Sequence, residues 1–115
     1  MIFVIDSNVE MADCIVRACE NNEVRIFHNA IEAMQGLSGE LPELIFMDVM
    51  LTGPDGFSFL NELISYEDTS KVPVVVASAL DLEKYNLDIY GVVGVLNKDT
   101  MKPEDVRKYV TKYAQ

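Results

Sequence analysis

The chain has 115 residues, 50% of them hydrophobic, and a formal net charge of −10 at pH 7. This length and composition are typical of one domain with a substantial core, and we expect residues 1–115 to form a single domain. The excess of acidic residues argues against binding to nucleic acid or to an anionic membrane through a broad basic face. It favours a basic partner surface, or an acidic surface that only aids solubility.

The first apolar segment, residues 2–5, predicts a buried strand. It is too short for a signal peptide or a membrane span, so we expect a soluble, cytoplasmic protein. The polar residues 6–8 then begin a loop and can cap a helix. That helix contains Cys14 and Cys19, which we expect to be reduced, half-buried thiols without a metal or redox role.

The following segments alternate between strand and helix patterns. Residues 23–27 predict a short strand, and residues 30–37 predict an amphipathic helix. The segment 44–47 is apolar throughout, as expected of a strand buried on both faces of a parallel sheet, and Asp48 follows it. A buried carboxylate is costly unless it has a partner or a role, so Asp48 is the first candidate for chemistry.

The second half of the chain continues the alternation after a loop rich in turn residues at 52–56. The expected elements are a helix over 57–64, a strand over 72–77, a weak helix over 81–90, a strand over 92–96 and a helix over 103–113. Strand and helix thus alternate five times, which predicts right-handed crossovers and an α/β fold with helices on both faces of a parallel sheet. Periodicity alone does not give the order of the strands.

Four polar side chains end or follow predicted strands, namely Asp6, Asp48, Ser78 and Lys98. In a parallel sheet these strand ends meet at one edge, where ligands of open α/β sheets bind. Any one of these residues has an ordinary explanation as a helix cap. A set of four that includes a lysine is not explained by capping.

The chemistry that suits this set is phosphoryl transfer to a carboxylate. Asp48 would be the nucleophile, and Asp6 and Asp48 would hold a hard divalent cation such as Mg²⁺. Ser78 would hydrogen-bond one phosphoryl oxygen, and Lys98 would neutralise another. Without the cation, two neighbouring carboxylates raise each other's proton affinity, whereas with it both stay ionised.

The whole chain resembles the receiver domains of two-component response regulators. The resemblance rests on Val4-Ile5-Asp6, on the segment from Asp48 to Gly56, on Ala77-Ser78-Ala79 and on Lys98. It implies a flavodoxin-like, doubly wound (βα)5 sandwich, in which a five-stranded parallel sheet has the order 2-1-3-4-5.

The resemblance also implies that Asp48 accepts a phosphoryl group from a histidine kinase or a histidine phosphotransfer protein, with Mg²⁺ bound. The implied metal ligands are Asp6, Asp48 and the backbone carbonyl of Met50, with Ser7 as a further candidate. Such a domain is a signalling switch and not an enzyme. Its output would be a contact with a downstream protein, a homodimer, or an effector domain outside these residues, with the last helix and residues 81–99 as the contact surface.

Several positions depart from the family pattern. Ser7 stands where receivers usually carry a second acid that touches the metal, which puts the affinity for Mg²⁺ in doubt. Thr52 and Asp99 replace prolines, and Val95 replaces an aromatic residue that usually moves together with the hydroxyl residue. These departures support an alternative, a degenerate receiver that acts as a protein-interaction module without phosphorylation.

Two further expectations concern the rate of hydrolysis and the class of protein. Met50 and Leu80 hold positions that tune acyl-phosphate hydrolysis in the family, and because apolar groups cannot orient water, we predict slow loss of phosphate. A third hypothesis is an aspartate-nucleophile phosphohydrolase, which would need a second acid where Asn8 stands. His28 is the single histidine, which excludes a multi-histidine metal site, and we expect it at the surface or at a strand edge.

Overall fold

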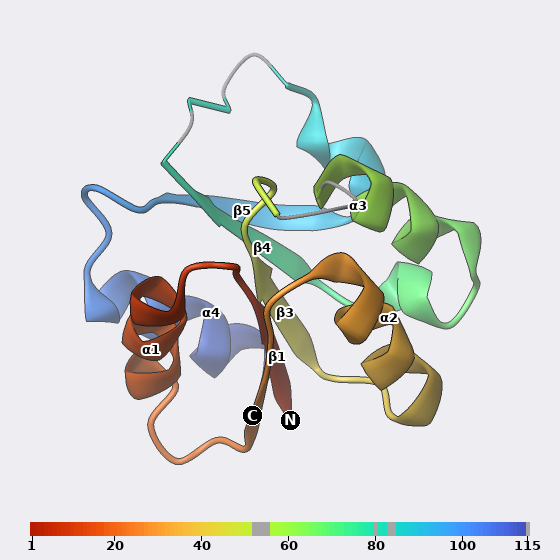
Figure 1. Ribbon diagram of the computed structural model, residues 1–115. Coiled ribbons are helices and arrows are strands. Elements are labelled where there is room, and N and C mark those ends of the chain that lie inside the picture. Colours follow the sequence, from red (N-terminus) through yellow and green to blue (C-terminus); the bar gives the residue numbers. More distant parts are fainter. Residues whose placement is uncertain (52–55, 80, 83–84, 115) are drawn as a thin grey trace.

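The computed structural model describes residues 1–51, 56–79, 81–82 and 85–114. Five parallel strands form one sheet of order β2-β1-β3-β4-β5 (Figure 1), which confirms the order that the resemblance implies. The strands are β1 (Ile2–Ile5), β2 (Val24–Phe27), β3 (Leu44–Met47), β4 (Val74–Ser78) and β5 (Val92–Asn97). Each lies within one or two residues of the segment that its apolar pattern predicts.

In the part of the chain that the structure describes, four α-helices cover the two faces of the sheet (Figure 1). They are α1 (Val9–Ala18), α2 (Ala30–Gly39), α3 (Gly56–Ser65) and α4 (Pro103–Tyr113). The pair α1 and α4 packs on one face and the pair α2 and α3 on the other, so each face has its own apolar core. Among the described residues, no helix is both long enough and apolar enough to cross a membrane.

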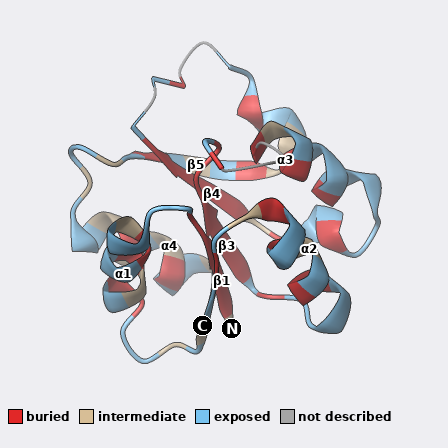
Figure 2. Cartoon of the chain, in the orientation of Figure 1, coloured by how far each residue is buried: buried red, intermediate tan, exposed pale blue. Residues whose placement is uncertain are grey.

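The burial of the strands follows their place in the sheet. Figure 2 shows the three central strands, β1, β3 and β4, buried along their whole length. The edge strands β2 and β5 are exposed in part. Continuous apolar sequences are therefore found where both faces of a strand are covered by helices.

The predicted helix over 81–90 is wrong in type and extent. Among the described residues between β4 and β5, the only helix is the short 3-10 helix η2 (Leu87–Tyr90), which ends at Gly91 in the left-handed conformation, with φ of 78°. Tyr85 and Ile89, whose spacing suggested the helix, are 45% and 61% exposed. Ile89 is thus largely exposed, and the ring of Tyr85 packs on Phe57, so the described residues of this segment form no continuous apolar stripe that would stabilise a longer helix. A second 3-10 helix, η1 (Thr69–Lys71), precedes β4.

The helix starts show which polar residues serve as caps. The side chain of Asn8 accepts a hydrogen bond from the backbone N–H of Met11 at the start of α1, and Asn29 does the same for Glu32 at the start of α2. Asn8, and not Asp6, therefore caps α1, so capping does not account for the Asp6 carboxylate.

The two cysteines differ in their surroundings. Both thiols are free, but Cys14 is exposed on α1 and Cys19, just after the helix, is 1% exposed. The expectation of two half-buried thiols is therefore wrong. A spacing of five residues places them on different sides of the helix, one toward the solvent and the other toward the core.

Candidate functional site

The sheet brings the predicted strand-end residues to one edge. Asp6 follows β1 and Asp48 follows β3, and because Ile5 pairs with Met47 in the parallel register, the two aspartates are neighbours. The backbone N–H of Asp48 donates to the carbonyl of Ile5 over 3.0 Å. The local order of the sheet thus fixes both carboxylates beside each other.

The other half of the site comes from β4 and β5. Ser78 is the last residue of β4 and pairs with Asn97, and Lys98 follows directly. The Lys98 backbone N–H donates to the Ser78 carbonyl over 3.0 Å. Lys98 therefore lies at the carboxyl ends of the strands, as Asp48 does.

One ammonium group lies against both carboxylates. Lys98 Nζ is 2.7 Å from Asp6 Oδ2 and 2.5 Å from Asp48 Oδ2. Asp6 is 1% exposed, Asp48 is 7% exposed and the Lys98 side chain is 9% exposed. These three side chains are almost completely buried. Two acidic groups and one basic group give the site one formal negative charge in excess.

The second oxygen of each carboxylate is held by the backbone. Asp6 Oδ1 accepts from the N–H of Asn8 over 2.8 Å, and Asp48 Oδ1 accepts from the N–H of Met50 over 2.9 Å. These turns fix the orientation of both side chains. Asp6 Oδ2 is buried and accepts no directed hydrogen bond, so its contact with Lys98 is an ion pair only.

The carboxylates determine the titration of Lys98. Burial alone would lower the pKa of Lys98, but the contacts with Asp48 and Asp6 outweigh it and raise that pKa above its ordinary value. The ammonium group therefore stays charged throughout the physiological range. It is a fixed positive charge beside the Asp48 carboxylate.

The remaining predicted residues have different surroundings. Ser78 is fully buried at the end of β4, and Ser7 is exposed. The Met50 side chain is 56% exposed and Val95 on β5 is 47% exposed. Leu80 and Thr52 lie outside the described residues.

The sequence did not predict the contact that His28 makes with this edge. His28 is exposed, as expected, and its Nδ1 lies 3.0 Å from the backbone carbonyl of Asp6. Phe27 pairs with Ile5, so the residue after β2 necessarily lies beside the residue after β1. The strand order, in which β1 lies between β2 and β3, is the signal from which the contact between His28 and Asp6 could have been predicted.

The chemistry of the donors suits Mg²⁺. Lys98 Nζ contacts one oxygen of each carboxylate, and Asp6 Oδ2 is a buried oxygen that still lacks a directed hydrogen bond. Mg²⁺ is commonly bound by one or two carboxylates and several waters. Within the described ranges no cluster of three His, Cys, Asp or Glu residues is present. The residues therefore fit an ion that two aspartates, one backbone carbonyl and water would hold.

Similarity to known proteins extends over almost the whole chain. The family model described as "Response regulator receiver domain" matches residues 2–111. The response regulator PleD of Caulobacter vibrioides is 34% identical over 77 residues, which cover 67% of this chain and 17% of PleD. The chain thus corresponds to a small part of that relative's length.

Solved structures show the same fold. The receiver domain of NtrX from Brucella abortus superposes with a TM-score of 0.86 at 23% identity, covering 97% of this chain and 96% of that one. The Mn²⁺-bound form of response regulator Rcp1 has a TM-score of 0.72 at 21% identity, covering 96% of this chain and 88% of that one. At these identities the likeness concerns the fold alone.

Proposed function

Because the chain belongs to the family of response regulator receiver domains, which are signalling domains, we propose that it is a phosphoacceptor switch with Asp48 as the acceptor. The observation that carries the proposal is the pair of short contacts from Lys98 Nζ to Asp6 and Asp48. Such a cation neutralises charge where a phosphoryl group would arrive. The single sheet supports treating residues 1–115 as one receiver domain.

The proposed reaction transfers a phosphoryl group from a histidine nitrogen of the donor protein to a carboxylate oxygen of Asp48. A carboxylate oxygen of Asp48 attacks the phosphorus of a phosphohistidine on a histidine kinase or phosphotransfer protein. The P–O bond to Asp48 forms, the P–N bond breaks, and the electron pair of that bond returns to the imidazole of the donor. Lys98 neutralises one phosphoryl oxygen, and the hydroxyl of Ser78 at the end of β4 hydrogen-bonds another.

A divalent cation completes the proposed site. Asp6, Asp48 and the backbone carbonyl of Met50 would hold Mg²⁺, and its positive charge would offset that of the phosphoryl oxygens. Response regulator Rcp1, which has the same fold, is known in a Mn²⁺-bound form, and this supports the proposal that the present chain also binds a divalent ion. Ser7 is exposed and carries no charge, so we propose weaker binding than a third acid would give.

A degenerate receiver is the second candidate function. Ser7 in place of an acid and the exposed Val95 in place of a mobile aromatic residue favour it. In that case an unmodified surface would bind the downstream protein. A phosphohydrolase is less favoured, because the side chain at its second acid position, Asn8, caps α1.

The deciding experiment follows intact mass after incubation with a small-molecule phosphodonor and Mg²⁺. We expect one phosphoryl increment that disappears in Asp48→Asn and in samples without metal. If neither the phosphodonor nor a beryllofluoride mimic with a Mg²⁺ titration changes the protein, the switch is refuted and the degenerate receiver stands. Turnover of a small phosphate ester that Asp6→Asn abolishes would instead support the phosphohydrolase.

A further inference from the structure

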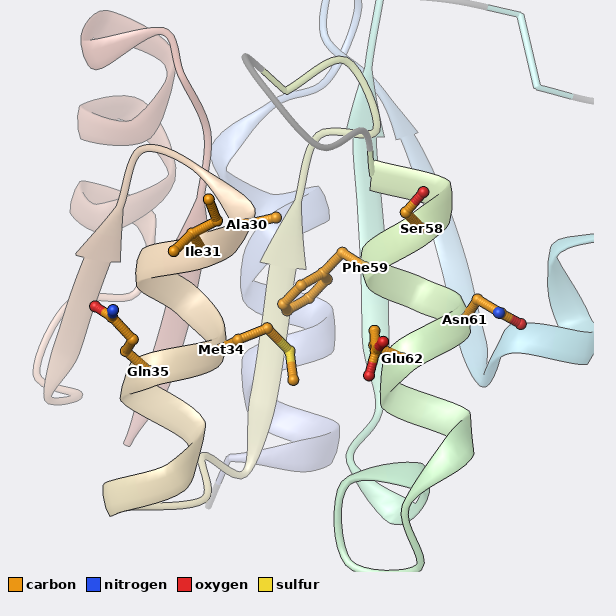
Figure 3. Close-up of a pocket in the computed structure, with 8 residues that line it drawn as sticks. All are labelled: Ala30, Ile31, Met34, Gln35, Ser58, Phe59, Asn61 and Glu62. Carbon is orange, nitrogen blue, oxygen red and sulfur yellow. The ribbon is translucent and has the colours of Figure 1, made fainter.

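A groove lies between α2 and α3, the two helices that cover one face of the sheet (Figure 3). Its volume is about 640 Å³, within the range of ligand and peptide pockets. Figure 3 shows the side chains of Met34 and Phe59 pointing into the space between the two helices. Phe59 on α3 and Ala30 on α2 are buried, whereas Ile31, next to Ala30, is 57% exposed. The groove therefore offers an apolar floor and an apolar wall to the solvent.

The segment of the chain that forms the groove carries negative charge only. Residues 29–70 contain five Glu and three Asp but no Lys, Arg or His. Each helix has one charged residue, Glu32 on α2 and Glu62 on α3, and both are exposed. Glu62 lines the groove together with the polar Gln35. Cationic side chains are therefore the charged groups that suit this rim.

We propose that this groove binds an amphipathic, basic helix of a partner protein. Each of the two helices has 10 residues, so the groove is about 15 Å long, which about three turns of a bound helix would fill. Apolar side chains at positions i, i+4 and i+7 would lie along the groove on Ile31, Phe59 and Met34, and flanking Lys or Arg residues would pair with Glu62 and Glu32. Met34 adapts its shape to different apolar groups. The binding does not require phosphorylation of Asp48.

The test uses synthetic helical peptides of about 15 residues and the isotope-labelled chain. The first peptide carries Leu at i, i+4 and i+7 with Lys on the flanks, and the second has the same composition with the Leu residues spread around the helix. We expect the first peptide to shift backbone NMR signals of α2 and α3, and the second to bind about tenfold more weakly.

Two variants and two matched controls identify the surface. Ile31→Asn should weaken the first peptide about tenfold, and Glu62→Lys should weaken it about threefold at low salt. Val9→Asn on α1 replaces an equally exposed apolar residue, at 59% against 57% for Ile31. Glu104→Lys on α4 makes the same charge change elsewhere. Both controls should bind as the unmodified chain does.

Other outcomes overturn the proposal. Equal affinity for the two peptides would mean attraction by charge alone. Absence of binding, or unchanged affinity in Ile31→Asn, would remove the groove as a site for such helices. If α2 and α3 signals shift with the concentration of the chain itself, a second copy occupies the groove and the partner proposal fails.

Discussion

At the scale of single residues, Lys98 balances two buried carboxylates. We expect Lys98→Met to lower the free energy of unfolding by about 3 kcal/mol near pH 7, because breaking a buried ion pair leaves unpaired charge. The pKa of Lys98 is raised in the folded state, so its stabilisation is fully present below the ordinary lysine value of 10.5 and is lost as pH rises through the folded pKa. Denaturant titrations across this range measure both effects.

Lys108 provides the control for that substitution because it is exposed on α4. Lys108→Met should change the free energy of unfolding by less than about 0.5 kcal/mol. The interpretation fails if the two variants are equally stable. It also fails if the deficit of Lys98→Met does not shrink above the folded pKa of Lys98.

Met50 concerns the lifetime of the proposed phosphorylated state. Its side chain is 56% exposed two residues after Asp48, and a thioether cannot orient an attacking water. We predict that Met50→Asn speeds loss of the phosphoryl group about tenfold, since an amide can position water. The rate is followed by intact mass after removal of the donor. Leu41→Asn, an exposed apolar change away from Asp48, serves as control, and equal rates in all three proteins would contradict the prediction.

The cysteines test burial residue by residue. Burial raises the pKa of Cys19 to about 11, and Cys14 is exposed. At about pH 8 a thiol reagent should therefore modify Cys14 at least about a hundredfold faster than Cys19, because the thiolate is the reactive form. Peptide mapping by mass spectrometry assigns the sites. Comparable rates for the two thiols in the native protein would contradict the prediction and show that Cys19 is accessible. Comparable rates in denaturant are expected, because unfolding exposes both thiols.

At the scale of elements, the start of α3 depends on a close approach of two backbones. A Cβ on Gly56 would lie 2.3 Å from the Cα of Val49, and the Gly56 N–H donates to the Val49 carbonyl over 2.9 Å. We expect Gly56→Ala to cost about 2 kcal/mol, since backbone must move. At Gly39, the last residue of α2, a Cβ meets nothing within 4 Å, so Gly39→Ala should be neutral or slightly stabilising. Thermal unfolding of both variants measures the difference, and equal melting temperatures would contradict it.

The sequence predicted the five strands, and the error among the connecting helices is the one over 81–90. The segment 44–47 is apolar throughout, because both faces of β3 are covered. Such a continuous apolar segment can be recognised without knowing which strands lie next to it. Helical spacing over 81–90 was misleading because Ile89 is 61% exposed and the ring of Tyr85 packs on Phe57. Spacing alone does not show whether a stripe has a surface to pack on.

At the scale of the whole molecule, the strand order brings the strand ends together. Periodicity predicted that Asp6, Asp48 and Lys98 end strands, but their distances follow from which strands are neighbours. That order came from the resemblance to a family. The contact of His28 with Asp6 could not be predicted without it, because 22 residues of chain separate them.

The net charge of −10 should also affect the stability of the whole molecule. Raising NaCl from about 20 mM to about 500 mM screens the repulsion among acidic side chains, so the melting temperature should rise by about 4 °C. MgCl₂ at equal ionic strength should add a further increase if the ion binds only the folded state, and Asp6→Asn should lose that excess but keep the response to NaCl. A fall in melting temperature with NaCl would contradict the screening argument. An excess that survives in Asp6→Asn would place the ion elsewhere on the acidic surface.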